Sequence, residues 1–174
     1  MTVAPIRTVV EKLVSGGQSG ADRAALDVAL ELGLDCGGWV PRGRLAEDGA
    51  IPERYPNLVE TESRDPAVRT ERNVRDSDAT VIVSLGALHG GSALTRDVAA
   101  RLPRRLLHID LACASIDAAA ARVRSWLADV RPRTLNVAGP RASEDPRIFE
   151  DVRQILCLAL ATQAIAEEPA GDRQ

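Results

Sequence analysis

TVIVSLGALHGGSALTRDVAARL, residues 80–102, decides the fold because it passes from a strand through a glycine-rich loop into a helix. Residues 80–85 are nearly all apolar, as expected of a strand that helices cover on both faces. Residues 86–92 contain three glycines, and residues 91–102 then have the composition of a helix. A buried strand that leads into a helix is the repeating unit of a parallel α/β sheet.

The same alternation of strand and helix continues towards both ends of the chain. Further strands are predicted at residues 8–14, 36–40, 58–59, 105–109 and 134–138. Further helices are predicted at residues 21–32, 66–77, 115–130 and 145–166, and Asp65–Pro66, Ser115 and Asp145–Pro146 are the expected caps of the last three. We therefore predict one Rossmann-like α/β domain, residues 1–166, with helices on both faces of a parallel sheet and a polar tail at residues 167–174.

The composition limits the compartment and the partners. The net charge of −3 is too small to indicate a nucleic acid or another polyanion as partner. Cys36, Cys113 and Cys157 are odd in number and have no CxxC spacing, which favours a reducing, cytoplasmic compartment and argues against structural zinc. The first residues lack the apolar run of a signal peptide, and no stretch approaches the length of a membrane span.

Ligands of open parallel sheets bind beyond the carboxyl ends of the strands, so the loops at residues 15–20, 41–55, 86–92 and 139–144 are the place to look. The first of these loops, SGGQSG, opens a helix, and glycines there let backbone N–H groups approach an anion. Ser19 with Asp22 also fits a capping box, which would explain the loop without a ligand. We predict ligand contacts from Gly16, Gly17, Gln18, Ser19, Gly20, Asp22 and Arg23.

The loop at residues 86–92 has an equivalent position, after the central strand and before a helix. Two glycine-rich helix starts on one sheet edge favour a shared cleft, although a plain turn would also use these glycines. The predicted ligand contacts here are Gly90, Gly91, Ser92 and Thr95. His89 is weak evidence for catalysis, and His108, which alternates within a strand, is expected to be a packed core residue.

The loop at residues 38–49 combines residue types that could bind a flat, charged molecule. Trp39 offers a stacking face, Arg44 a phosphate contact, and Glu47 and Asp48 could accept hydrogen bonds from ring nitrogens. The alternative is a surface loop with solvated charges and Trp39 in the core.

The helix at residues 66–77 begins at the same edge of the sheet. Arg69, Thr70 and Asn73 are predicted to point towards the cleft, whereas Arg72 and Asp76 are spaced for an ion pair on the helix surface. No combination of Ser, His and Asp and no cluster of metal ligands is evident in the sequence, so we predict neither catalytic residues nor a metal site.

Five stretches of the chain resemble the molybdenum cofactor carrier family, and together they span nearly all of residues 14–158. They are SGGQSGADRAALDVALELGL (15–34), GGWVPRGRLAEDGAIPERYP (37–56), RTERNVRDSDATVIVS (69–84), GGSALT (90–95) and LNVAGPRAS (135–143). The resemblance implies a Rossmann-like fold, a homo-oligomer of four chains, and binding of molybdenum cofactor without chemical turnover, with a molybdoenzyme as recipient.

The wider superfamily includes phosphoribohydrolases that release cytokinin bases from nucleoside monophosphates. Arg69 and Asp78 match part of the pattern of these enzymes, but their glutamate after the glycine loop is absent here. Molybdenum cofactor is a flat pterin with a phosphate and an anionic metal end, and a nucleotide would need similar binding groups. An anionic small molecule is therefore the expected ligand, with a phosphoribohydrolase or a nucleotide sensor as alternatives to the carrier.

Overall fold

The computed structural model describes residues 10–161 and contains a six-stranded sheet in which every strand pairing is parallel. The strand order is β5-β2-β1-β8-β6-β7. The strands are β1 (Lys12–Val14), β2 (Asp35–Val40), β5 (Leu58–Glu60), β6 (Ala79–Ser84), β7 (Arg105–Asp110) and β8 (Thr134–Ala138). The predicted Rossmann-like α/β fold is confirmed.

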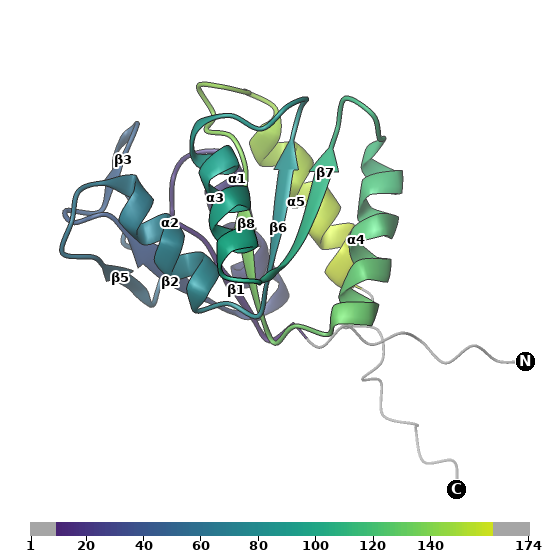
Figure 1. Cartoon of the computed structure of the whole chain (residues 1–174), viewed down its shortest axis with the longest axis horizontal. Coiled ribbons are helices and arrows are strands. Elements are labelled where there is room, and N and C mark those ends of the chain that lie inside the picture. Colours follow the sequence, from purple (N-terminus) through teal and green to yellow (C-terminus); the bar gives the residue numbers. More distant parts are fainter. Residues whose placement is uncertain (1–9, 162–174) are drawn as a thin grey trace, which may run out of the picture.

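Helices cover both faces of this sheet (Figure 1). The helices α1 (Ala21–Leu32), α4 (Ile116–Val130) and α5 (Ile148–Leu160) pack together on one face, and α2 (Pro66–Arg75) and α3 (Gly90–Arg101) pack together on the other. All six residues of β6 are buried, as the nearly all-apolar run at residues 80–85 predicts for a central strand. Small side chains such as Ala24, Ala25 and Ala29 let α1 lie close to its neighbours in the main core.

The first turns of the helices test the predicted caps. Asp65 accepts a hydrogen bond from the N–H of Ala67 with Pro66 at the start of α2, and Ser115 caps α4 in the same way, so both predictions are confirmed. The last helix was predicted to begin at Asp145 but begins at Ile148. The Asp145 carboxylate instead accepts the N–H of Arg147 and closes a turn before the helix.

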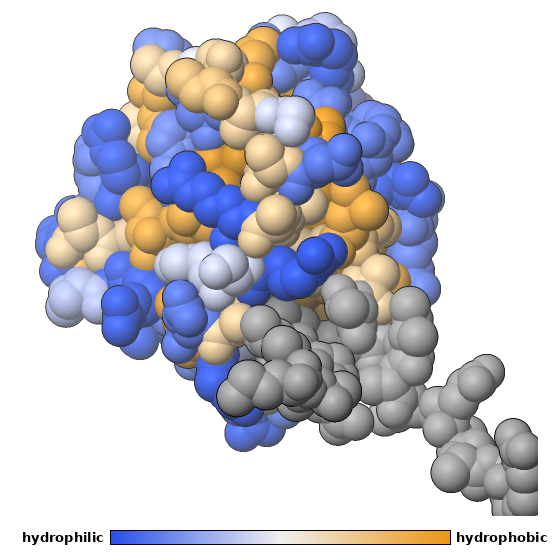
Figure 2. Space-filling model, turned by 90° about the vertical axis from the view of Figure 1, so that its right-hand side faces the viewer, coloured by the Kyte–Doolittle hydropathy of each residue, from blue (hydrophilic) through white to orange (hydrophobic). Residues whose placement is uncertain are grey.

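The loops after β6 and β8 lie at the upper edge of the sheet in Figure 1, and the segment that follows β2 extends to the left, where β3 is labelled. Within the long loop at residues 41–55, β3 (Leu45–Ala46) and β4 (Gly49–Ala50) form a short antiparallel hairpin that the sequence did not reveal. On the side of the molecule where α4 lies, hydrophobic residues are interspersed with hydrophilic ones at the surface (Figure 2). The predicted strand residues 8–9, the helical residues 162–166 and the polar tail lie outside the described part of the chain.

Candidate ligand-binding site

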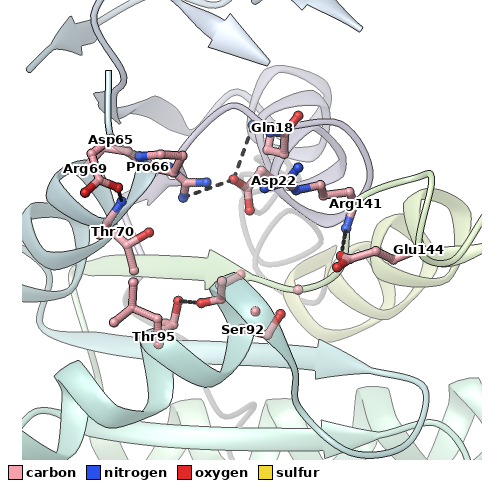
Figure 3. A pocket seen from close by; sticks show the side chains of 16 residues that line it. Gln18, Asp22, Asp65, Pro66, Arg69, Thr70, Ser92, Thr95, Arg141 and Glu144 are labelled. Atoms are coloured by element: carbon pink, nitrogen blue, oxygen red, sulfur yellow. Dashed lines mark hydrogen bonds and ion pairs between the residues drawn. The ribbon is translucent and has the colours of Figure 1, made fainter. Parts of the chain in front are cut away.

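A cavity of about 250 Å³ lies at the carboxyl edge of the sheet, where the first turns of α1, α2 and α3 converge on the end of β8 (Figure 3). Eight of the predicted ligand contacts border it. They are Gln18, Asp22, Arg69, Thr70, Gly90, Gly91, Ser92 and Thr95.

The start of α3 gives this cavity its clearest feature for binding an anion. The cap residue His89 makes no capping hydrogen bond through its side chain. Within residues 10–161, the N–H groups of Gly90 and Gly91 donate no hydrogen bond, and a Cβ atom on Gly91 would meet nothing within 4 Å. Free N–H groups at the positive end of a helix dipole are suited to bind a phosphate or another anion.

Arg69 supplies a positive charge from α2 to the same cavity. Its Nη1 lies 3.5 Å from Oδ2 of Asp22, and its buried Nε has no hydrogen-bond partner among the described residues. Gly16 makes room for this guanidinium, because a Cβ atom on Gly16 would stand 2.0 Å from Nη1 of Arg69. Arg69 is therefore held at the cavity wall with hydrogen-bonding capacity to spare.

The carboxylate of Asp22 binds to the backbone of the first glycine loop. It accepts the N–H of Gln18 at 3.2 Å and pairs with Arg69. Burial raises the pKa of Asp22 above its ordinary value, although Arg69 and nearby N–H groups act in the opposite direction. Since the N–H of Ser19 also bonds a side chain, Oε1 of Gln18, much of this loop's donor capacity is used internally.

The capping box predicted for Ser19 and Asp22 is wrong, because Gly20 precedes the first helical residue and no side chain caps it. The hydroxyl of Ser19 donates instead to Glu47 at the tip of the β3–β4 hairpin and accepts the N–H of Ala142. Ser19 thus connects the hairpin with the loop after β8.

Glu47 and Asp48 fasten the hairpin to the first glycine loop and do not border the cavity. Glu47 accepts the N–H of Ser143 at 3.1 Å and both the Ser19 and Ser143 hydroxyls, and these bonds lower its pKa. Asp48 forms a two-pronged pair with Arg23, one prong at 2.7 Å, and this hydrogen bond lowers the pKa of Asp48. Hydrogen bonds from the ring nitrogens of a ligand to these two carboxylates stay a prediction. Both carboxylates already have partners within the protein, and a ligand would compete with them.

Trp39 and Asn73 lie away from the cavity, contrary to the geometry expected from the sequence. Both border a different cavity of about 200 Å³ that reaches Lys12 and Thr134, the first residues of their strands. Asn73 joins α2 to β2, because it accepts the N–H of Trp39 at 2.8 Å and donates to its carbonyl at 2.9 Å. Side-chain direction on a strand or helix depends on tertiary packing, which loop position alone does not reveal.

The surface pair predicted for Arg72 and Asp76 is also wrong. Arg72 stacks over the Trp39 ring, 4.8 Å from its centre, and pairs with Glu62. Asp76 accepts the indole N–H of Trp39 at 2.8 Å. Trp39 therefore has Arg72 over one face of its ring and Asp76 at its indole N–H.

Arg44 has a structural role in the hairpin. Its guanidinium donates to the carbonyls of Ile51 and Pro52 at 3.1 and 3.0 Å, and its backbone has a positive φ of 52°. Gly17 and Gly20 also adopt positive φ, which shows that these two glycines are needed for the turn into α1 whether or not a ligand binds.

Several residues that sequence reasoning missed border the cavity, including Asp65, Arg141 and Glu144. Arg141 and Glu144 come from the loop after β8, where Glu144 accepts the N–H of Arg141 at 2.9 Å. This loop follows the carboxyl end of β8, and ligands of open parallel sheets bind beyond the carboxyl ends of the strands. The loop could therefore be identified from the sequence, although its individual residues could not.

His108 is half-buried, and its Nε2 lies 2.8 Å from the Ser84 hydroxyl. Burial lowers the pKa of His108. The nearby Asp110 carboxylate is occupied by the N–H groups of Gly86 and Ala112, at 2.7 and 2.9 Å. The structure therefore pairs a serine with a histidine but orients the acid towards the loop backbone.

Residues 10–161 contain no group of three or more His, Cys, Asp and Glu side chains arranged to hold a metal ion. In the same part of the chain, no helix has the length and apolar character needed to cross a bilayer.

The parallel sheet, the helices on both of its faces and the cavity at the strand ends define a single Rossmann-like α/β domain. The chain belongs to the circularly permutated YpsA SLOG family, whose model matches residues 13–160. It is also similar to a solved structure, at 1.45 Å resolution, of a protein from Syntrophus aciditrophicus SB that bears the name "Putative molybdenum carrier protein". The two chains share 48% identity with a TM-score of 0.86, over 88% of this chain and 97% of the other. No curated protein matches the chain.

Proposed function

We propose that the protein binds molybdenum cofactor in the cavity of about 250 Å³ and carries it without chemical turnover. The observation that carries the proposal is the pair of free N–H groups at Gly90 and Gly91, which share the cavity with the guanidinium of Arg69. These groups would hold the phosphate of the cofactor. The name of the solved relative supports a molybdenum-related ligand.

The residues after the glycine loop support carriage over hydrolysis. In the phosphoribohydrolases of the wider superfamily, a glutamate follows this loop. Here Ala93, Leu94 and Thr95 follow it, and the Thr95 hydroxyl bonds the carbonyl of Gly91 at 2.8 Å. The first acid, Asp97, is exposed and pairs with Arg96, so it does not border the cavity.

The carrier proposal predicts that the protein protects the cofactor. Cofactor released anaerobically from a molybdoenzyme would be incubated alone, with the protein, or with variants, and its remaining capacity to reconstitute an apo-molybdoenzyme followed over time. The protein should extend this lifetime, and Arg69→Ala should abolish the extension. Arg96→Ala, which removes an exposed arginine from α3, is the matched control and should protect like the unaltered protein.

A second candidate function, hydrolysis of a nucleoside monophosphate to free base and ribose phosphate, is favoured by Asp22. Its buried carboxylate borders the same cavity, lies beside Arg69 and has a raised pKa, and these are properties of a general acid. Incubation with AMP, followed by chromatography for adenine, tests this candidate. Adenine release that Asp22→Asn abolishes, without protection of molybdenum cofactor, would replace the carrier with the hydrolase.

We further propose a homotetramer that acts in the cytoplasm and delivers its cargo to a molybdoenzyme. Helix faces are the expected contacts, and two observations support this. Leu158 on α5 is 43% exposed, and hydrophobic residues lie among hydrophilic ones at the surface on the side of α4 (Figure 2). Light scattering at micromolar concentration should give four times the chain mass, and a monomer would contradict the assembly.

A further inference from the structure

A second cavity, of about 560 Å³, lies beside the first. The loops that follow β6 and β8 line it, and both loops lie above the sheet in Figure 1. Ser92 and Glu144 border both cavities, so the two form adjoining compartments at the start of α3. A ligand that places its phosphate in the first compartment could therefore extend into the second.

The walls of the second cavity are suited to a flat ring. Its apolar lining residues are Leu85, Ala87, Leu88, Pro140 and Pro146. Ligand cavities that bind heterocycles combine such apolar walls with a few polar groups that fix the orientation of the ring. The polar group that distinguishes this cavity is Asp145.

Asp145 borders the cavity and is only 8% exposed. Its Oδ1 accepts the N–H of Arg147 at 3.1 Å, whereas its Oδ2 is buried without a hydrogen-bond partner among the described residues. The nearest cation is the largely exposed guanidinium of Arg147, with Nε 4.0 Å from Oδ1. A buried carboxylate oxygen without a donor is unfavourable. Since Oδ2 has almost no accessible surface in the structure, a ligand reaches it only when the Asp145 side chain turns towards the cavity that the residue borders.

We propose that the second cavity recognises a heterocycle that carries a ring N–H beside an exocyclic amino group, and that Asp145 accepts hydrogen bonds from this edge. The inference rests on the proposed function, because it assigns the ring of the ligand whose phosphate the first cavity holds. Guanine and pterins present these two donors side by side, in the forked arrangement that a carboxylate accepts. Adenine presents a ring lone pair at the corresponding position, which a carboxylate repels.

Calorimetric titration with GMP, IMP and AMP tests the recognition of this edge. GMP should bind at least about tenfold more tightly than AMP, since hydrogen bonds to a charged group are involved. IMP keeps the ring N–H but lacks the amino group, and should lie between the two. In Asp145→Asn, affinity for GMP should fall about tenfold or more, while XMP, whose carbonyl replaces the amino group, should bind more tightly than before. Equal binding of GMP and AMP, together with no effect of Asp145→Asn, would overturn the proposal.

A second variant tests the cavity without altering Asp145. Ala87 is exposed and borders the second cavity, so Ala87→Trp should fill the cavity and weaken GMP binding. Affinity for inorganic phosphate, which needs only the first cavity, should stay unchanged. Ala100→Trp, at an exposed position near the end of α3, is the control for the added side chain and should bind GMP normally.

Nucleosides separate this inference from the proposed function. Guanosine should be preferred over adenosine even though neither carries a phosphate. That preference would stand if inorganic phosphate failed to bind, in which case the phosphate site would be refuted and the ring site retained. Phosphate binding without any preference for guanosine or GMP would refute the ring site alone.

Discussion

The close approach of Gly16 and Arg69 allows the anion site to be altered without touching a charged residue. A Cβ atom on Gly16 would stand 2.0 Å from Nη1, 2.3 Å from Cζ and 2.6 Å from Nε of Arg69. Gly16 has no positive φ, so alanine fits the backbone there. Because the clash is with the far end of a flexible side chain, Gly16→Ala should displace the guanidinium from the cavity wall and leave the fold intact.

The expected magnitude follows from the contact that is lost. A hydrogen bond to a charged group contributes about 1.5–3 kcal/mol, so affinity for a phosphate-bearing ligand should fall about ten- to a hundredfold. Moving Arg69 away also leaves the buried carboxylate of Asp22 without its cation, so the free energy of unfolding should fall by up to about 3–5 kcal/mol, less where Asp22 becomes protonated or keeps the N–H of Gln18 as donor. Arg69→Ala should cause a similar loss of affinity, and the double variant should lose no more than either single variant.

Equilibrium dialysis with molybdenum cofactor under anaerobic conditions, combined with thermal unfolding, measures both quantities for all three variants. The reasoning would be refuted if Gly16→Ala bound the cofactor as the unaltered protein does. It would also be refuted if the losses from Gly16→Ala and Arg69→Ala added in full, because two independent contacts would then be involved.

Three further predictions concern residues around the site. Asn73→Ala should lower the free energy of unfolding by about 2–4 kcal/mol, because two hydrogen bonds to the Trp39 backbone are lost. Equilibrium dialysis should show unchanged ligand affinity. A folded variant with lost affinity would place Asn73 in the ligand site. The hydrogen bonds that lower the pKa of Glu47 stabilise the fold at pH values above 4.5, its ordinary pKa, and this stabilisation is lost as the pH falls through the lowered pKa. The free energy of unfolding measured in urea should therefore depend less steeply on pH in this range in Glu47→Gln than in the unaltered protein. Gly17→Val should destabilise the fold by about 1–3 kcal/mol in thermal unfolding, because φ is +69° there and a Cβ atom would approach a buried isoleucine; native stability would show that the turn tolerates the change.

Local chemistry explains why most of the fold could be predicted. Asp65 with Pro66 and Ser115 determine helix starts through contacts within a few residues, and a nearly all-apolar run such as residues 80–85 has few options other than a buried strand. The start of α5 could not be predicted in this way. Asp145 has the right residue type for a cap, but its carboxylate closes a preceding turn instead.

The candidate site was predicted in outline because strand ends and glycine loops are visible in a sequence. Its details depend on contacts between residues far apart in the chain. Asn73 and Trp39 bond each other across 34 positions, and Ser19 bonds Ala142 across 123. The hydrogen bond from the N–H of Gln18 to the carboxylate of Asp22 was also not predictable from the sequence. The sequence of this loop fits a capping box between Ser19 and Asp22 equally well.

Mass spectrometry of the ligand that co-purifies with the protein tests the central claim most directly. The protein would be isolated without oxygen from cells that synthesise molybdenum cofactor, and the small molecules released on denaturation would be weighed and quantified. The account predicts phosphorylated molybdopterin in proportion to the protein, and its loss from the Gly16→Ala variant. A nucleoside monophosphate in its place, or no phosphorylated pterin above the level of that variant, would contradict the account.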